Sequence, residues 1–256
     1  MRFLSILAAL GAAFASPFTD VAQNEISARD ASDSVQFIFI NNLDAQQKVY
    51  IVGRVEEKWA FVQQNGSIAL VGHFNSLADV AITLAANEKD RKIDIPRPLV
   101  EGRIYSAESD LHFITNGETL GHPHPGHNVQ AREAIRWNSM DFQLPSDSRF
   151  LSAAIDYQLF IGTPTFSFSI TSSDGRTESV RGLRNDCVEN FCKGEKDGKD
   201  AKLCVVNGSK YLRIFQPLPF AQKNPQAFAQ YCQTSSGDGR GIGVVADAQQ
   251  MTITLG

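Results

Sequence analysis

The segment KWAFVQQNGSIALV, residues 58–71, consists of two apolar runs separated by a short polar turn. The runs are rich in aromatic and β-branched residues, which favour extended strands. Asn65-Gly66 lies between them, and an Asn-Gly pair flanked by such runs is the strongest short-range signal for a β-hairpin. The segment therefore predicts two neighbouring antiparallel strands.

Short runs of the same kind recur on both sides of this hairpin, separated by turn residues. They cover residues 35–41, 48–53, 79–85, 111–115, 137–144, 154–161, 165–171, 202–206, 211–215 and 251–255. Many short strands at regular spacing are typical of an antiparallel sandwich or barrel. We therefore predict an all-β domain over residues 35–256.

The beginning of the chain has the pattern of a secretory signal peptide. Arg2 precedes an apolar run from Phe3 to Phe14, and small residues follow at the position of cleavage. The run is too short to span a bilayer, and no later segment is long and apolar enough. We expect residues 1–15 to be the signal peptide, residues 16–34 to be a flexible lead-in, and the protein to be secreted to the extracellular space or the cell wall.

All the cysteines lie in the last third of the chain. An even number in an oxidising compartment predicts two disulfides, with three possible pairings. A zinc site would need a second close pair of cysteines, which the spacing lacks. The four are Cys187, Cys192, Cys204 and Cys232.

The cysteines also mark a region that differs from the strand-rich remainder. The best helix candidate is 224–233, where Asn224 can cap the first turn and Pro225 suits its first position. We therefore expect a small, disulfide-stabilised, partly helical appendage at about 185–235.

Two sequons and the charge balance bear on the environment and the partner. Asn65 and Asn207 each begin an Asn-Gly-Ser triplet, so both are predicted glycosylation sites in exposed turns. The net charge of −4 is mildly acidic, and basic residues are not concentrated in one segment. We therefore expect a monomer that binds a neutral polymer or small molecule, not nucleic acid, and that has no cofactor.

Residues 137–144 carry a polar face on an otherwise apolar strand. With a period of two, Trp137, Asp141 and Gln143 share one face, while Met140, Phe142 and Leu144 share the other. The apolar set predicts the core side. The mixed aromatic and polar set is suited to stacking and hydrogen-bonding a sugar ring, although a solvated strand face has the same pattern.

A second carboxylate lies in the run 154–161. Read as one strand, it places Ile155, Tyr157, Leu159 and Ile161 on an apolar face, with Asp156 pointing the other way. Hydrolysis of a glycosidic bond needs a proton donor and a second carboxylate. Asp141 and Asp156 supply this pair if their strands are neighbours; otherwise they are two exposed aspartates.

The loop 117–128 contains His122, His124 and His127. Neutral imidazoles are good ligands for copper or zinc. The surrounding prolines spread these side chains, however, and no carboxylate is fixed nearby as a further ligand. We therefore predict no metal and a loop that lines a groove and hydrogen-bonds hydroxyl groups.

Several segments, taken in order, resemble a known family. They include VQFIFINNL from residue 35, IDIPRPLVEGRIYSA from residue 93, RWNSMDFQL from residue 136 and GTPTFSFSIT from residue 162. Together they resemble the catalytic domain of glycoside hydrolase family 64, secreted β-1,3-glucanases with a thaumatin-like β barrel beside a smaller mixed domain. The resemblance implies the same fold here, with a β-1,3-glucan or related cell-wall polysaccharide as partner.

Members of this family are inverting enzymes with a Glu acid in W-x-x-x-E-F and an Asp base in Y-V-D-F-V-G-x-P. Carried over, Asp141 stands at the acid position, one methylene shorter than Glu. An ungapped fit places Leu159 at the base position, whereas a gapped fit equates Asp156 with the base. We favour the ungapped fit, because an insertion within a strand moves every later side chain to the wrong face.

The resemblance implies two candidate functions. One is a β-1,3-glucan hydrolase with Asp141 as acid and Asp156 as a displaced base. The other is a glucan-binding or cell-wall-associated protein that has lost catalysis. In both, the groove is lined by Trp137, Gln143, His122, His124 and His127. Beyond residue 220 the chain is shorter than is usual in the family, so we expect part of one groove wall to be absent.

Overall fold

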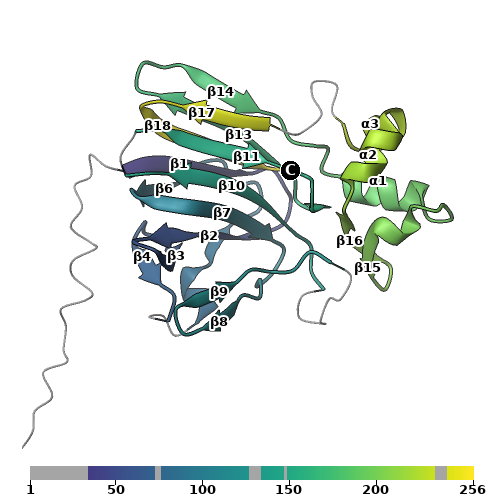
Figure 1. Ribbon diagram of the computed structural model, residues 1–256, viewed down its shortest axis with the longest axis horizontal. Coiled ribbons are helices and arrows are strands. Elements are labelled where there is room, and N and C mark those ends of the chain that lie inside the picture. The colour runs from purple at the N-terminus through teal and green to yellow at the C-terminus, as the bar shows by residue number, and fades with distance from the viewer. Residues whose placement is uncertain (1–33, 73–75, 127–133, 147–148, 234–240) are drawn as a thin grey trace, which may run out of the picture.

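The computed structural model describes residues 34–72, 76–126, 134–146, 149–233 and 241–256. They form two packed β-sheets with a small helical appendage at one end (Figure 1). The all-β prediction is confirmed. The expected signal peptide and nearly all of the lead-in lie outside the described residues, although Ser34 already begins the first strand.

The smaller sheet of the sandwich has five strands. Their order is β14 (Thr177–Val180), β13 (Phe166–Ser172), β18 (Ala248–Leu255), β1 (Ser34–Asn41) and β6 (Arg91–Pro96). The pairing of β1 with β18 is parallel, and the other pairings in this sheet are antiparallel. The first and last described strands are therefore adjacent at the centre of one sheet.

The larger sheet has eight antiparallel strands. The main path runs through β17 (Gly241–Val245), β11 (Leu151–Ile155), β10 (Trp137–Leu144), β7 (Leu99–Ala107), β2 (Gln47–Val55), β3 (Lys58–Val62) and β4 (Ile68–Leu70), and β5 (Ile82–Leu84) also pairs with β2. Two short strands, β8 (Ile114–Asn116) and β9 (Thr119–Gly121), form a separate hairpin.

The predicted hairpin at Asn65-Gly66 is confirmed. The Gln63 N–H donates to the Ser67 carbonyl at 2.8 Å, which closes the turn between β3 and β4. Gly66 has a φ of +84°, a conformation that glycine adopts without steric cost. Asn65 is exposed in this turn, and Asn207 is exposed at the end of β15, so both sequons are accessible.

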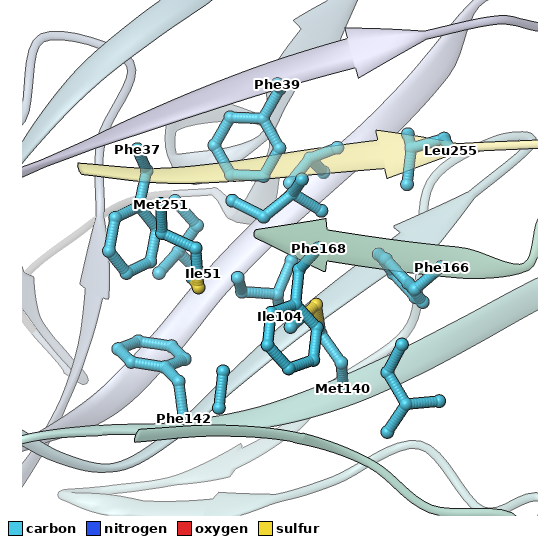
Figure 2. Packing of buried hydrophobic residues seen from close by; sticks show 14 of the residues in the cluster. Phe37, Phe39, Ile51, Ile104, Met140, Phe142, Phe166, Phe168, Met251 and Leu255 are labelled. Atoms are coloured by element: carbon cyan, nitrogen blue, oxygen red, sulfur yellow. The ribbon is translucent and has the colours of Figure 1, made fainter. Parts of the chain in front are cut away.

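The core lies between the two sheets. Figure 2 shows Phe37 of β1 and Met251 of β18 facing Ile104 and Phe142 of the larger sheet. The rings of Phe37 and Phe142 meet edge to face, with centroids 5.3 Å apart. The predicted inward face of residues 137–144 is confirmed, because Met140, Phe142 and Leu144 are all buried in this core.

The expected single strand over 154–161 is wrong. The chain leaves the larger sheet at Ile155, turns through residues 156–159, and enters a new strand, β12 (Phe160–Gly162). β12 pairs with β16 of the appendage instead. The period-two reading therefore fails here, and Leu159 is exposed while Phe160 is buried.

The appendage lies between β14 and β17 in the chain. It contains α1 (Cys187–Gly194), a 3-10 turn (Ala201–Leu203), β15 (Cys204–Asn207), β16 (Lys210–Phe215), α2 (Leu218–Lys223) and α3 (Pro225–Cys232). A further 3-10 turn, Leu77–Val80, lies in the sandwich. The predicted helix at 224–233 is confirmed as α3, although Asn224 makes no side-chain capping bond.

Both predicted disulfides are present, and the pairing left open by the sequence is Cys187–Cys232 and Cys192–Cys204. The first joins α1 to α3, and the second joins α1 to β15. The thiols are therefore not available to a metal. Among the described residues, no helix is long and apolar enough to cross a membrane.

Candidate functional site

The outer face of the larger sheet, which points away from the sandwich core, gathers the polar side chains of β10 with those of its neighbours. Asp141 is central on this face. It pairs across the ladder with Arg103 of β7 on one side and Ala154 of β11 on the other. Its side chain is 51% exposed, so it is accessible to a ligand.

Arg103 holds the Asp141 carboxylate. Its Nε donates to Asp141 Oδ1 at 2.5 Å. A charge-assisted bond of this length is strong and directional. It fixes the carboxylate over the sheet and engages one of its two oxygens.

Tyr105, two residues further along β7, connects Arg103 to the histidine loop. Its hydroxyl lies 2.8 Å from His122 Nδ1. Burial raises the pKa of Tyr105 to about 12, and burial together with the nearby charge of Arg103 lowers the pKa of His122. The phenol and the imidazole therefore share one hydrogen bond, in which the tautomer of His122 decides which group donates.

A second ion pair lies beside the first. Arg54 of β2 donates from Nη1 to Glu101 Oε1 at 3.1 Å, and the Glu101 N–H donates to Gln143 Oε1 at 2.9 Å. The Arg54 guanidinium lies 5.8 Å from the ring centre of Trp59. Gln143 is exposed on the predicted face of β10. It is connected through Glu101 to Arg54, and the sequence indicated neither of these two residues.

Trp137 does not form part of the exposed surface. It is 2% exposed, and its ring packs against Phe160 at 4.6 Å, Tyr105 at 5.9 Å and the Arg213 guanidinium at 4.9 Å. The predicted stacking of Trp137 on a sugar does not fit this burial. Trp137 instead packs against the buried ring of Tyr105 and so helps to fix the position of that side chain.

Asp156 lies just beyond the end of β11. Ala154 of β11 is directly opposite Asp141 of β10, and Asp156 is two residues further along the chain than Ala154. Its Oδ1 accepts from the Gln158 N–H at 2.9 Å, which stabilises the turn. Leu159 ends this turn and is 61% exposed.

The three predicted loop histidines have different positions. His122 is half-buried against Trp59, with ring centres 5.0 Å apart. His124 is exposed and accepts from the Gly126 N–H at 3.0 Å, and His127 lies outside the described residues. In the part of the chain that the structure describes, no three His, Cys, Asp or Glu side chains are placed to hold a metal ion.

The profile of the β-1,3-glucanase family, glycoside hydrolase family 64, matches residues 33–235. The chain belongs to this family. The resemblance seen in the sequence is thereby confirmed, and the match covers the appendage and every strand of the sandwich except β17 and β18. No curated protein matches the chain.

Solved structures of family 64 share the fold. A laminaripentaose-producing β-1,3-glucanase in complex with laminaritetraose is 17% identical with a TM-score of 0.61, and the match covers 74% of this chain and 54% of that one. The laminaripentaose-producing enzyme from Paenibacillus barengoltzii, complexed with laminarihexaose, is 13% identical with a TM-score of 0.61 and coverages of 91% and 79%. A β-1,3-glucanase domain from Clostridium beijerinckii is 12% identical with a TM-score of 0.53 and coverages of 88% and 98%.

The outer side of the larger sheet in this family 64 chain also carries residues that the sequence did not indicate: Trp59, Glu101 and Arg103, which reach the surface, and Tyr105, which is buried beneath it. Three of them lie in VEGRIY, where Glu101, Arg103 and Tyr105 alternate with other residues. That period of two is the signal that could have placed them together on one face. Trp59 carries no such signal, because only the pairing of β2 with β3 brings it to Arg54.

Proposed function

We propose that this chain is a β-1,3-glucan-active protein that binds the polysaccharide across the outer face of its larger sheet. One observation carries the proposal: in a family 64 chain, an accessible carboxylate, Asp141, lies among aromatic and hydrogen-bonding side chains on the outer face of a β-sheet. Such a mixed surface suits a neutral sugar polymer, which offers hydroxyl groups and apolar ring faces.

The finer form of the proposal is hydrolysis by Asp141 and Asp156. Asp141 donates a proton to the glycosidic oxygen as the bond to the anomeric carbon breaks, and Asp156 takes a proton from the water that attacks that carbon from the opposite side. The turn at 156–159 supports this pairing, because an inserted residue in a turn does not shift the faces of a strand. A gapped fit that equates Asp156 with the catalytic base therefore does not require an insertion within a strand.

Binding without hydrolysis is the second candidate, and the Asp141–Arg103 ion pair favours it. A guanidinium at 2.5 Å is a partner for a carboxylate anion, whereas a general acid has to carry a proton. The exposed Leu159 at the base position of the ungapped fit points the same way, because leucine cannot accept a proton.

Two assays on the same preparation separate these functions. Retention on insoluble β-1,3-glucan measures binding, and reducing-sugar release from laminarin measures hydrolysis. If the chain is a hydrolase, Asp141→Asn abolishes release, while Asp247→Asn, at an exposed aspartate in the β17–β18 turn, does not. Retention without release supports the binding protein. Absence of both would refute the glucan proposal.

A further inference from the structure

Glu101 has a backbone conformation that is unusual for its side chain. β7 carries one more residue than each neighbour here, because Gly102 and Leu99 face Phe142 and Leu144 of β10, and Arg103 and Val100 face Val52 and Arg54 of β2. The extra residue forms a β-bulge in which Glu101 has a φ of +49°. The left-handed position of a bulge ordinarily takes glycine, and a side chain there costs free energy.

The bulge directs the Glu101 carboxylate toward the outer face. Glycine is required one residue later, because a Cβ at Gly102 would lie 2.5 Å from the Phe142 ring. The Glu101 N–H is held by Gln143 at 2.9 Å, and its carboxylate meets Arg54 at 3.1 Å. A bulge that re-aims a side chain next to a polar surface is typical of a ligand site.

Trp59 provides the aromatic surface next to this carboxylate. The chain has two tryptophans, and only Trp59 reaches the outer surface, since Trp137 is buried. The Arg54 guanidinium is 5.8 Å from the Trp59 ring centre, near the outer limit of a cation–π contact. The Glu57 carbonyl accepts from its Nε and Nη2 at 3.2 and 2.8 Å, so Arg54 is fixed beside the indole.

The charges on this surface favour a neutral ligand. Arg54 is paired with Glu101, and Arg103 with Asp141, so the two cations offset the two carboxylates. Paired side chains of this kind present both donors and acceptors without net charge. That combination fits the hydroxyl groups of a sugar better than a phosphate or carboxylate.

We propose that Trp59 and Glu101 form a sugar subsite beside Asp141, which takes one glucose ring of a β-1,3-glucan. The apolar face of the ring packs on the exposed part of the Trp59 indole, Glu101 accepts hydrogen bonds from ring hydroxyls, and Arg54 stays with Glu101 and donates to the sugar. This inference rests on the proposed glucan-binding function and identifies which part of the face holds the polymer.

The two tryptophans give the subsite its own spectroscopic test. Titration of the full chain with laminarihexaose should change the indole fluorescence, and the change should disappear in Trp59→Phe and persist in Trp137→Phe. Isothermal calorimetry of the same titrations should show an affinity at least tenfold weaker for Trp59→Phe. An unchanged affinity and fluorescence response in Trp59→Phe would overturn the subsite.

Glu101 is tested by separating stability from binding. Glu101→Gly should relieve the left-handed strain and leave the melting temperature equal or higher, while the affinity for laminarihexaose falls at least tenfold. Asp247→Gly is the matched control, because Asp247 has the same φ of +49° in the turn between β17 and β18. It should raise the melting temperature without changing the affinity.

The outcomes separate the subsite from the proposed function. If the unaltered chain binds laminarihexaose and Glu101→Gly binds equally well, the subsite is wrong and the glucan proposal stands. If the unaltered chain binds neither laminarihexaose nor insoluble β-1,3-glucan, both fall. Weaker binding in Trp59→Phe and Glu101→Gly, with normal binding in Asp247→Gly, supports both.

Discussion

Tyr105 links the outer face to the packing beneath it. Its ring contacts Phe113 at 5.2 Å and Trp137 at 5.9 Å, while its hydroxyl bonds His122. The side chain is 1% exposed, so burial opposes its ionisation more strongly than the nearby Arg103 guanidinium favours it. The phenol therefore stabilises the fold only while it is protonated.

We predict that Tyr105 makes the protein sensitive to alkali. Its pKa is raised from 10.0 to about 12, so its contribution is complete below pH 10 and is lost as the pH rises through 12. The full effect corresponds to ~2–3 kcal/mol. Urea unfolding between pH 8 and pH 12 should show a steeper loss of stability in the unaltered chain than in Tyr105→Phe. Parallel pH profiles would contradict this assignment.

At the scale of single elements, the sequence predicts a strand best where that strand buries one face and exposes the other. Residues 137–144 form β10 as predicted, because their alternation matches one core side. The run 154–161 misled because Tyr157 and Leu159 continue an apolar alternation, although the chain turns at the Asp156–Gln158 bond. Local pattern does not reveal that β12 pairs with a distant strand, β16.

The same limit applies to the candidate site. Asp141 and Gln143 were placed on the correct face, since both follow the alternation of β10. Trp137 shares that alternation but is covered by Phe160 and Arg213, which arrive from other elements. Burial by distant segments is a tertiary effect, and a single strand's pattern cannot show it.

We predict that Gly162 is required for β12 to cross over β10. A Cβ at this position would lie 1.9 Å from the Trp137 carbonyl oxygen, which is backbone and cannot rotate away. Gly162→Ala should therefore destabilise the fold by ~3 kcal/mol or more and shift the Trp137 emission toward that of an exposed indole.

Gly243→Ala is the matched comparison for this change. Its Cβ would approach the Phe168 ring at 2.9 Å, and that contact is a side chain that can adjust. We expect a clearly smaller loss of stability, measured by urea unfolding. Equal losses in the two variants would argue against a backbone contact between β12 and β10.

At the scale of the whole molecule, the appendage and the sandwich share one core. The buried cluster that contains Phe166 of β13 also contains Phe191 of α1 and Phe228 of α3. Arg213 of β16 packs on Trp137, and Lys210 forms an ion pair with Glu108 across the same junction. Because apolar contacts and charges both cross the junction, the two parts should unfold together.

The disulfides test this cooperativity from within the appendage. Cys187–Cys232 closes a separation of 45 residues and Cys192–Cys204 one of 12, so chain entropy predicts losses of ~4 and ~3 kcal/mol when each pair is replaced by alanine. If the core is shared, Trp137 fluorescence, which reports the sandwich, should shift to lower urea by as much as the far-ultraviolet signal of the helices. The larger shift should belong to the Cys187/Cys232 variant. A helical transition that precedes the Trp137 transition would instead show that the appendage unfolds on its own, because only an independent unit can lose its disulfide stabilisation without weakening the sandwich.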